Sequence, residues 1–272
     1  MSQTASLRAL RERIRHIEQP ARHGVLPFGI AAIDEALPGG GLARGAVHEI
    51  LGSDGDEEDG AAAAGFAAGI LARLTGRPVL WCLKRPDLYG PGLLAHGLDP
   101  ARLVLVGAPR DEDILWAVEE GLRTPGLAAV VGEIGRLPMV AGWRLQLAAE
   151  RSGVTAFLLR RWRNGEEAVA ERERPSAAVT RWRVRALPAQ EGDDPRLRHL
   201  IGRPRWRVEL LRCRGGVPAQ WVVESGIVEV ADATGHVRLS PELADRPAAA
   251  PNQKLGRREA DWRDIRPLQR TG

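Results

Sequence analysis

Five apolar runs of five or six residues recur along the first 160 residues, and segments of helical pattern separate them. The runs occupy residues 47–51, 78–83, 102–107, 127–132 and 154–159. Helical patterns cover residues 61–74, 92–97, 111–122 and 139–151. Because strands buried on both faces have near-continuous apolar runs, this alternation predicts an α/β fold with a mostly parallel sheet flanked by helices.

After residue 159 the pattern changes to short runs separated by Pro, Gly and Asp, which predicts antiparallel C-terminal strands that extend the sheet. The tetrapeptide Arg-Trp-Arg-Val occurs twice, at residues 181–184 and 205–208. Alternate residues of a strand point to opposite faces, so Trp and Val share one face and the arginines share the other. We therefore expect an apolar face against the core and a basic face toward solvent.

The connection after the first apolar run has the outline of a phosphate-binding loop but the wrong side chains. Gly55 and Gly60 have the right spacing, yet Ala61 and Ala62 stand where Lys and Ser or Thr would hold phosphate and Mg²⁺. A second register starts at Gly52 and places acidic residues at those positions. Because carboxylates repel a polyphosphate, we expect a degenerate loop, no cofactor and no catalysis. Three interpretations of the acidic residues stay open: a solvated loop, a site for a basic partner segment, or nucleotide binding by a rearranged loop.

The charge is unevenly distributed along the chain. Residues 1–150 carry 15 Lys and Arg against 19 Asp and Glu, whereas residues 151–215 carry 16 against 8. A genome that favours Arg codons and a surface for phosphate or an acidic partner both explain this excess.

The two cysteines, Cys82 and Cys213, each lie in an apolar run, so we expect buried free thiols in a reducing cytoplasm. No apolar run reaches the roughly 18 residues that span a bilayer, and Cys and His do not cluster at metal-ligand spacing. We expect a cytoplasmic protein with no metal.

The segment GIAAIDEALPGGGLARGAVHEILG resembles the start of RecA-like ATPase cores, in which a helix and a Gly-Gly-Gly turn precede the strand before the phosphate loop. This resemblance covers about residues 25–159. A more specific resemblance, to the ImuA family, extends over most of the chain. It rests on the blocks LYGPGLLAHGLDPARLVLVGA, WAVEEGLR, AAVVGEI, RLQLAAERSGVTAFLLR and RWRVELLRCRGGVPAQWVVE.

The ImuA resemblance implies a catalytically degenerate RecA-like protein of bacterial mutagenesis cassettes. It implies a role in translesion synthesis during the SOS response to DNA damage, with an ImuB-like inactive Y-family polymerase as partner. RecA, a second copy and single-stranded DNA are further candidate partners. Two other functions stay open: a SulA-like cell-division inhibitor, and a RecA-like ATPase with retained nucleotide binding.

An ATPase of RecA type would also need a base after its second strand and a carboxylate that assists Mg²⁺ at the end of its fourth. The first position is occupied by Lys84, flanked by Leu83 and Arg85, and Glu133 stands at the second. One of these two features therefore survives.

In RecA-like proteins the loop after the fifth strand faces DNA, and here it spans residues 160–178. Its candidate contacts are Arg160, Arg161, Trp162 and Arg163, because Arg contacts phosphates and Trp stacks on exposed bases. The glutamates that follow favour a solvated loop as the alternative. The tail supplies further candidates for a partner groove or DNA, namely Arg257, Arg258, Trp262, Ile265 and Arg266.

We expect three parts along the chain. Residues 1–23 form a helix and linker, residues 24–245 form the RecA-like core with its β-rich extension, and residues 246–272 form a disordered or partly helical basic tail. The first helix carries an apolar stripe, which we term the N-terminal stripe, made of Leu7, Leu10, Ile14 and Ile17. This stripe packs on its own chain, on a partner or on a second copy.

Overall fold

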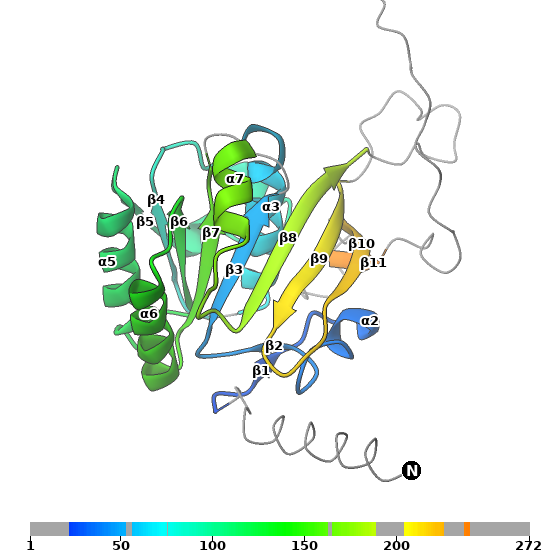
Figure 1. Ribbon diagram of the computed structural model, residues 1–272, viewed down its shortest axis with the longest axis horizontal. Coiled ribbons are helices and arrows are strands. Elements are labelled where there is room, and N and C mark those ends of the chain that lie inside the picture. The colour runs from blue at the N-terminus through cyan, green and yellow to red at the C-terminus, as the bar shows by residue number, and fades with distance from the viewer. Residues whose placement is uncertain are drawn as a thin grey trace, which may run out of the picture. The chain divides into compact units, whose positions relative to one another are not determined.

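A computed structural model describes residues 22–52, 56–74, 76–162, 165–188, 204–225 and 237–239. These residues contain one large mixed sheet with the strand order β11-β10-β9-β8-β3-β7-β6-β4-β5 (Figure 1). Its strands are β3 (Val47–Gly52), β4 (Val79–Leu83), β5 (Leu103–Gly107), β6 (Ala129–Ile134), β7 (Thr155–Arg160), β8 (Thr180–Leu187), β9 (Arg205–Cys213), β10 (Ala219–Ser225) and β11 (Val237–Leu239). A separate small sheet pairs β1 (Val25–Leu26) with β2 (Leu42–Ala43).

The strands from β5 to β8 are parallel, and the strands from β9 onward are antiparallel to their neighbours. The five predicted parallel strands are thus confirmed, as is the mostly parallel sheet with an antiparallel extension that is expected of a RecA-like core. One detail differs, because β8 joins β3 in parallel and the antiparallel part begins one strand later.

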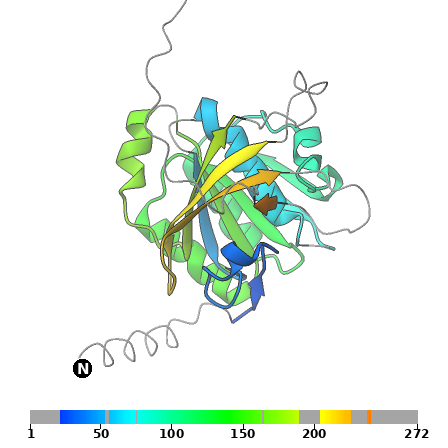
Figure 2. The ribbon, with the colours of Figure 1, turned by 90° about the vertical axis from the view of Figure 1, so that its right-hand side faces the viewer.

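Helices cover both faces of the parallel part of the sheet (Figures 1 and 2). α5 (Asp111–Leu122) and α6 (Met139–Ser152) pack on one face, and α3 (Asp56–Leu71) packs on the other. The shorter helices are α2 (Ala31–Asp34), α4 (Gly90–Leu94), the 3₁₀ turn η1 (Pro100–Arg102) and α7 (Gly165–Arg172). Helix α7 occupies a segment for which the sequence predicted only a loop.

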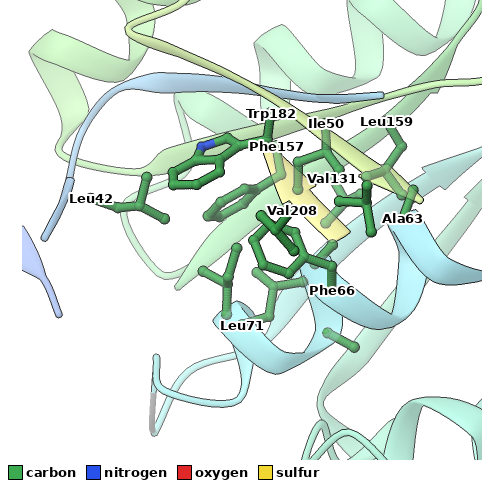
Figure 3. Packing of buried hydrophobic residues seen from close by; sticks show 14 of the residues in the cluster. Leu42, Ile50, Ala63, Phe66, Leu71, Val131, Phe157, Leu159, Trp182 and Val208 are labelled. Atoms are coloured by element: carbon green, nitrogen blue, oxygen red, sulfur yellow. The ribbon is translucent and has the colours of Figure 1, made fainter. Parts of the chain in front are cut away.

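The core under α3 is built around aromatic rings (Figure 3). Phe66 of α3 lies 5.8 Å from the ring of Trp182 in β8 and 6.5 Å from that of Trp206 in β9. Val184 and Val208 are fully buried beside these rings. Because these Trp and Val residues come from the repeated Arg-Trp-Arg-Val tetrapeptides, the prediction of an apolar strand face against the core is confirmed.

The opposite face of the same strands carries the arginines. Arg185 and Arg207 are exposed and face each other across the pair of strands β8 and β9, whereas Arg183 is half-buried and forms an ion pair with Glu209. The predicted basic face toward solvent is therefore confirmed for Arg185 and Arg207 but wrong for Arg181, which is buried because it pairs with Glu49.

Candidate functional site at the carboxyl edge of the sheet

The connection between β3 and α3 is shorter than the sequence suggested. Strand β3 ends at Gly52 and α3 begins at Asp56, so only three residues separate the two elements. The register based on Gly55 and Gly60 is wrong, because the residues between these glycines belong to a helix and not to a loop. Ala61 and Ala62 accordingly lie in the second turn of α3, where Ala61 is exposed and Ala62 is buried.

The acidic residues of this segment begin the helix rather than fill a loop. Carboxylates in a first helical turn are stabilised by the amino-terminal end of the helix dipole. The prediction of a solvated acidic loop is wrong for Asp59, whose side chain is buried. The carboxylate of Asp59 accepts a hydrogen bond of 2.8 Å from the backbone amide of Ala186 and so connects α3 to β8.

The carboxyl ends of the parallel strands meet at one edge of the sheet, which is where α/β proteins of this kind bind ligands. Glu133 lies there at the end of β6 and is buried. The indole nitrogen of Trp81 donates a hydrogen bond of 2.9 Å to one of its oxygens, and Arg161 pairs with the other at 3.0 Å. Burial raises the pKa of Glu133 above its usual value, although the charge of Arg161 and the Trp81 hydrogen bond act in the opposite direction.

Two further ion pairs occupy the same edge. Arg161 also reaches Asp87, beyond the end of β4, at 2.8 Å. Lys84 pairs at 2.8 Å with Asp111, the first residue of α5. Burial would raise the pKa of Asp111, but the hydrogen bonds from Lys84 and from the backbone amides of Arg136 and Gly135 together lower it.

A second charged cluster lies on the opposite face of the sheet, and it centres on Glu49 in the middle of β3. Glu49 has no exposed surface and forms ion pairs with Arg160 at 3.1 Å and Arg181 at 3.2 Å. Ser176 donates a hydrogen bond to the same carboxylate. Arg160 in turn pairs with Glu171 of α7 at 2.9 Å. We call Glu49, Arg160, Glu171 and Arg181 the Glu49 cluster; its two carboxylates balance its two guanidinium groups.

Two of the residues proposed for DNA contact therefore lie inside the protein. The expectation that Arg160 and Trp162 stand on an exposed loop is wrong, because both side chains are buried. The guanidinium of Arg160 lies 5.5 Å from the centre of the Trp162 ring, and the Trp162 indole donates to the carbonyl of Gly135 at 2.9 Å. Arg160 is buried because it compensates the charges of Glu49 and Glu171. Glu49 lies 111 residues away in sequence, so the local charge pattern does not reveal this partnership.

The remaining candidates have different placements. Arg161 is half-buried and engaged with Glu133 and Asp87. Arg163 and the tail candidates Arg257, Arg258, Trp262, Ile265 and Arg266 lie outside the described residues. A role of these residues in binding DNA or a partner stays a prediction.

Sequence reasoning missed the Glu49 cluster. A signal was present, since Glu49 lies within the strand-like run at residues 47–51, and a carboxylate in a strand buried on both faces needs a cationic partner. The identity of that partner depends on the strand order and could not be inferred from the run itself.

The chemistry available at this edge is limited by these contacts. Both oxygens of Glu133 are engaged, and the position after β4 that would carry a catalytic base holds Lys84 instead. Within the described part of the chain, no group of three His, Cys, Asp or Glu side chains is arranged to hold a metal ion. The edge joins strands and helices through ion pairs rather than presenting open ligands.

The sequence was compared with known proteins. No family model matches the chain. The proteins called "Protein ImuA" from two strains of Caulobacter vibrioides are each 41% identical to it over 243 residues. The aligned region covers 86% of this chain and 95% of each relative. The chain belongs to the ImuA family.

Membership in the ImuA family does not by itself assign an activity to the carboxyl edge of the sheet. The aligned length means that the ImuA relatives share nearly their whole extent with this chain. Among the described helices, none is long and apolar enough to cross a membrane.

Proposed function

We propose that the protein is a non-catalytic RecA-like adaptor in SOS-induced mutagenic translesion DNA synthesis. In this proposal it acts in the cytoplasm and binds a catalytically inactive Y-family polymerase relative of the ImuB type. Membership in the ImuA family supports the pathway and the partner, since the resemblance to that family implies both. RecA, single-stranded DNA and a second copy of the chain are secondary candidates.

One observation carries the non-catalytic part of the proposal: internal ion pairs occupy the edge at which a RecA-like ATPase would hold nucleotide. Arg161 spans from Glu133 to Asp87 and takes up the carboxylate that would assist Mg²⁺. The first turn of α3 consists of four Asp and Glu residues and contains no Lys or Arg, whereas a phosphate loop needs a cation. Nucleotide binding would require both features to be rearranged against buried hydrogen bonds.

Co-purification tests the adaptor role. The protein would be co-expressed with the ImuB-like polymerase relative, once at full length and once truncated after Arg246. We expect a stable complex with the full-length chain. Loss of the complex on truncation would locate the docking element in the tail, and retention would locate it in residues 1–246. Failure of the full-length chain to form any complex would contradict the proposal and favour the division-inhibitor alternative.

A further inference from the structure

Helix α6 carries an apolar stripe on its outer face. Val140, Trp143 and Leu147 are 72%, 50% and 48% exposed, and we call these three residues the α6 stripe. The side of α6 that carries Leu145 and Ala149 is buried against the sheet, so the α6 stripe points away from the core. Exposed apolar residues that line up along a helix mark a surface that another element covers.

The neighbouring helix α5 extends this surface. Its Trp116 is 65% exposed, and α5 lies beside α6 on the same face of the sheet (Figure 1). An ion pair between Glu119 and Arg144 joins the two helices at this level. Glu112 and Glu120 lie one turn before and one turn after Trp116, so acidic groups flank the apolar surface on its α5 side.

The described chain begins at the end of this surface. The imidazole Nε2 of His23 donates a hydrogen bond of 2.8 Å to the carbonyl of Glu150, in the last turn of α6. Gly153, which ends α6 with a φ of 79°, lies against the same imidazole. Residues 1–21 therefore leave the described structure beside the carboxyl end of α6.

The two stripes have matching patterns. The N-terminal stripe advances by three, four and three residues, and the α6 stripe advances by three and four. This alternation of three and four is the spacing by which two parallel helices interdigitate along a common seam. In a parallel arrangement Leu7 would lie beside Val140, and Ile14 would lie beside Leu147.

We propose that residues 7–17 form a helix that packs in parallel on α6 of the same chain, with the N-terminal stripe on the α6 stripe. A helix of this length is about 16 Å long, and α6 is about 21 Å long, so the one fits within the other. Residues 18–22 span up to about 17 Å when extended, which exceeds the roughly 8–10 Å between the axes of packed helices. Pro20 ends the helix inside this connection.

Charge supports the same occupant. Arg11 and Arg13 flank the N-terminal stripe on its two sides. Whichever side faces α5, an arginine lies toward the stripe formed by Glu112, Trp116 and Glu120. The docked helix thus places cations beside acidic groups on α5 and covers the exposed Trp143.

Cysteine cross-linking of the full chain tests this arrangement. The variant Ile14→Cys/Leu147→Cys pairs two positions that the proposal brings into contact. The matched control is Ile14→Cys/Leu105→Cys, because Leu105 is 55% exposed but lies on the edge strand β5, three strands away from β7, on which α6 packs. The native Cys82 and Cys213 are free, and burial raises the pKa of each thiol, so neither competes under mild oxidation.

The expected product is an intramolecular disulfide, seen as a faster-migrating monomer on a non-reducing gel for Ile14→Cys/Leu147→Cys and not for the control. Formation of a disulfide-linked dimer without the faster-migrating monomer would show that a second copy supplies the helix. That result would overturn the proposal. A result in which neither the intramolecular disulfide nor the dimer forms would also overturn the proposal.

A second measurement does not depend on oxidation. The variant Leu10→Asp should undock the helix and increase iodide quenching of tryptophan fluorescence, and this increase should disappear when Trp143→Phe is added. Equal quenching in the wild-type chain and in a fully folded Leu10→Asp variant would contradict the proposal.

Discussion

The Glu49 cluster makes a strong prediction about stability, because it neutralises four buried charges with no surplus. The variant Glu49→Gln keeps the shape of the side chain and removes its charge. Arg160 then keeps its ion pair with Glu171, whereas Arg181 loses its pair with Glu49 and keeps its hydrogen bonds to backbone carbonyls. The side chains of both arginines are almost fully enclosed. Removing one partner of a buried ion pair costs about 3–5 kcal/mol, because the remaining charge is left uncompensated away from water.

Urea denaturation followed by circular dichroism measures this loss. We expect the free energy of unfolding of Glu49→Gln to fall by about 3–5 kcal/mol with an unchanged dependence on urea, since the folded core stays compact. The matched control is Glu120→Gln, which breaks an exposed ion pair with Arg123 on α5 and should change stability by less than about 1 kcal/mol.

Two outcomes would refute the reasoning about this cluster. The first is a loss of less than about 1 kcal/mol in Glu49→Gln, a value typical of exposed pairs. The second is simple additivity of Glu49→Gln with Arg181→Gln, because groups in one buried network show coupling energies of about 0.5–3 kcal/mol.

Three further predictions follow from buried groups. Burial lowers the pKa of His48 from 6.5 to about 4 despite its hydrogen bond to Ala43. The unfolded chain therefore binds the proton first, so stability is complete above pH ~6.5 and falls by about 3 kcal/mol toward pH 4; chemical denaturation of His48→Gln should lack this component. A Cβ on Gly132 would lie 2.6 Å from a methyl group of Val118, so Gly132→Ala should lower the melting temperature, with a cost of about 1–3 kcal/mol. Burial raises the pKa of Cys82 to about 12, so a thiol reagent at pH 8 should label it only after unfolding, and rapid labelling of the native protein would contradict its placement.

The parallel sheet was predictable because most residues of β3, β4, β6 and β7 are buried and apolar. Their near-continuous apolar runs remain recognisable although Glu49 and Glu133 interrupt them. The predicted strand at residues 47–51 differs from β3 by one residue. The predicted helix at residues 111–122 coincides with α5, since Asp111 begins it and an apolar face repeats along it. Periodicity of this kind reports burial directly, and burial determines these elements.

The site was less predictable, because its contacts join residues that are distant in sequence. The start of α3 was missed since two glycines at loop spacing outweighed the preference of carboxylates for a first helical turn. The hydrogen bond between Asp59 and Ala186 spans 127 positions, and the pair of Glu49 with Arg160 spans 111. The order of the strands in the sheet determines such partners, and no local sequence pattern reveals that order.

The central claim is that ion pairs and an acidic helix start have replaced the nucleotide site of the RecA-like core. Isothermal titration of the pure full-length protein with Mg-ATP tests it most directly. We predict no saturable heat at millimolar nucleotide and no release of phosphate above the buffer rate. Saturable binding in the micromolar range, lost on Glu133→Gln but kept in Glu120→Gln, would contradict the claim and restore a functional nucleotide site at the carboxyl edge.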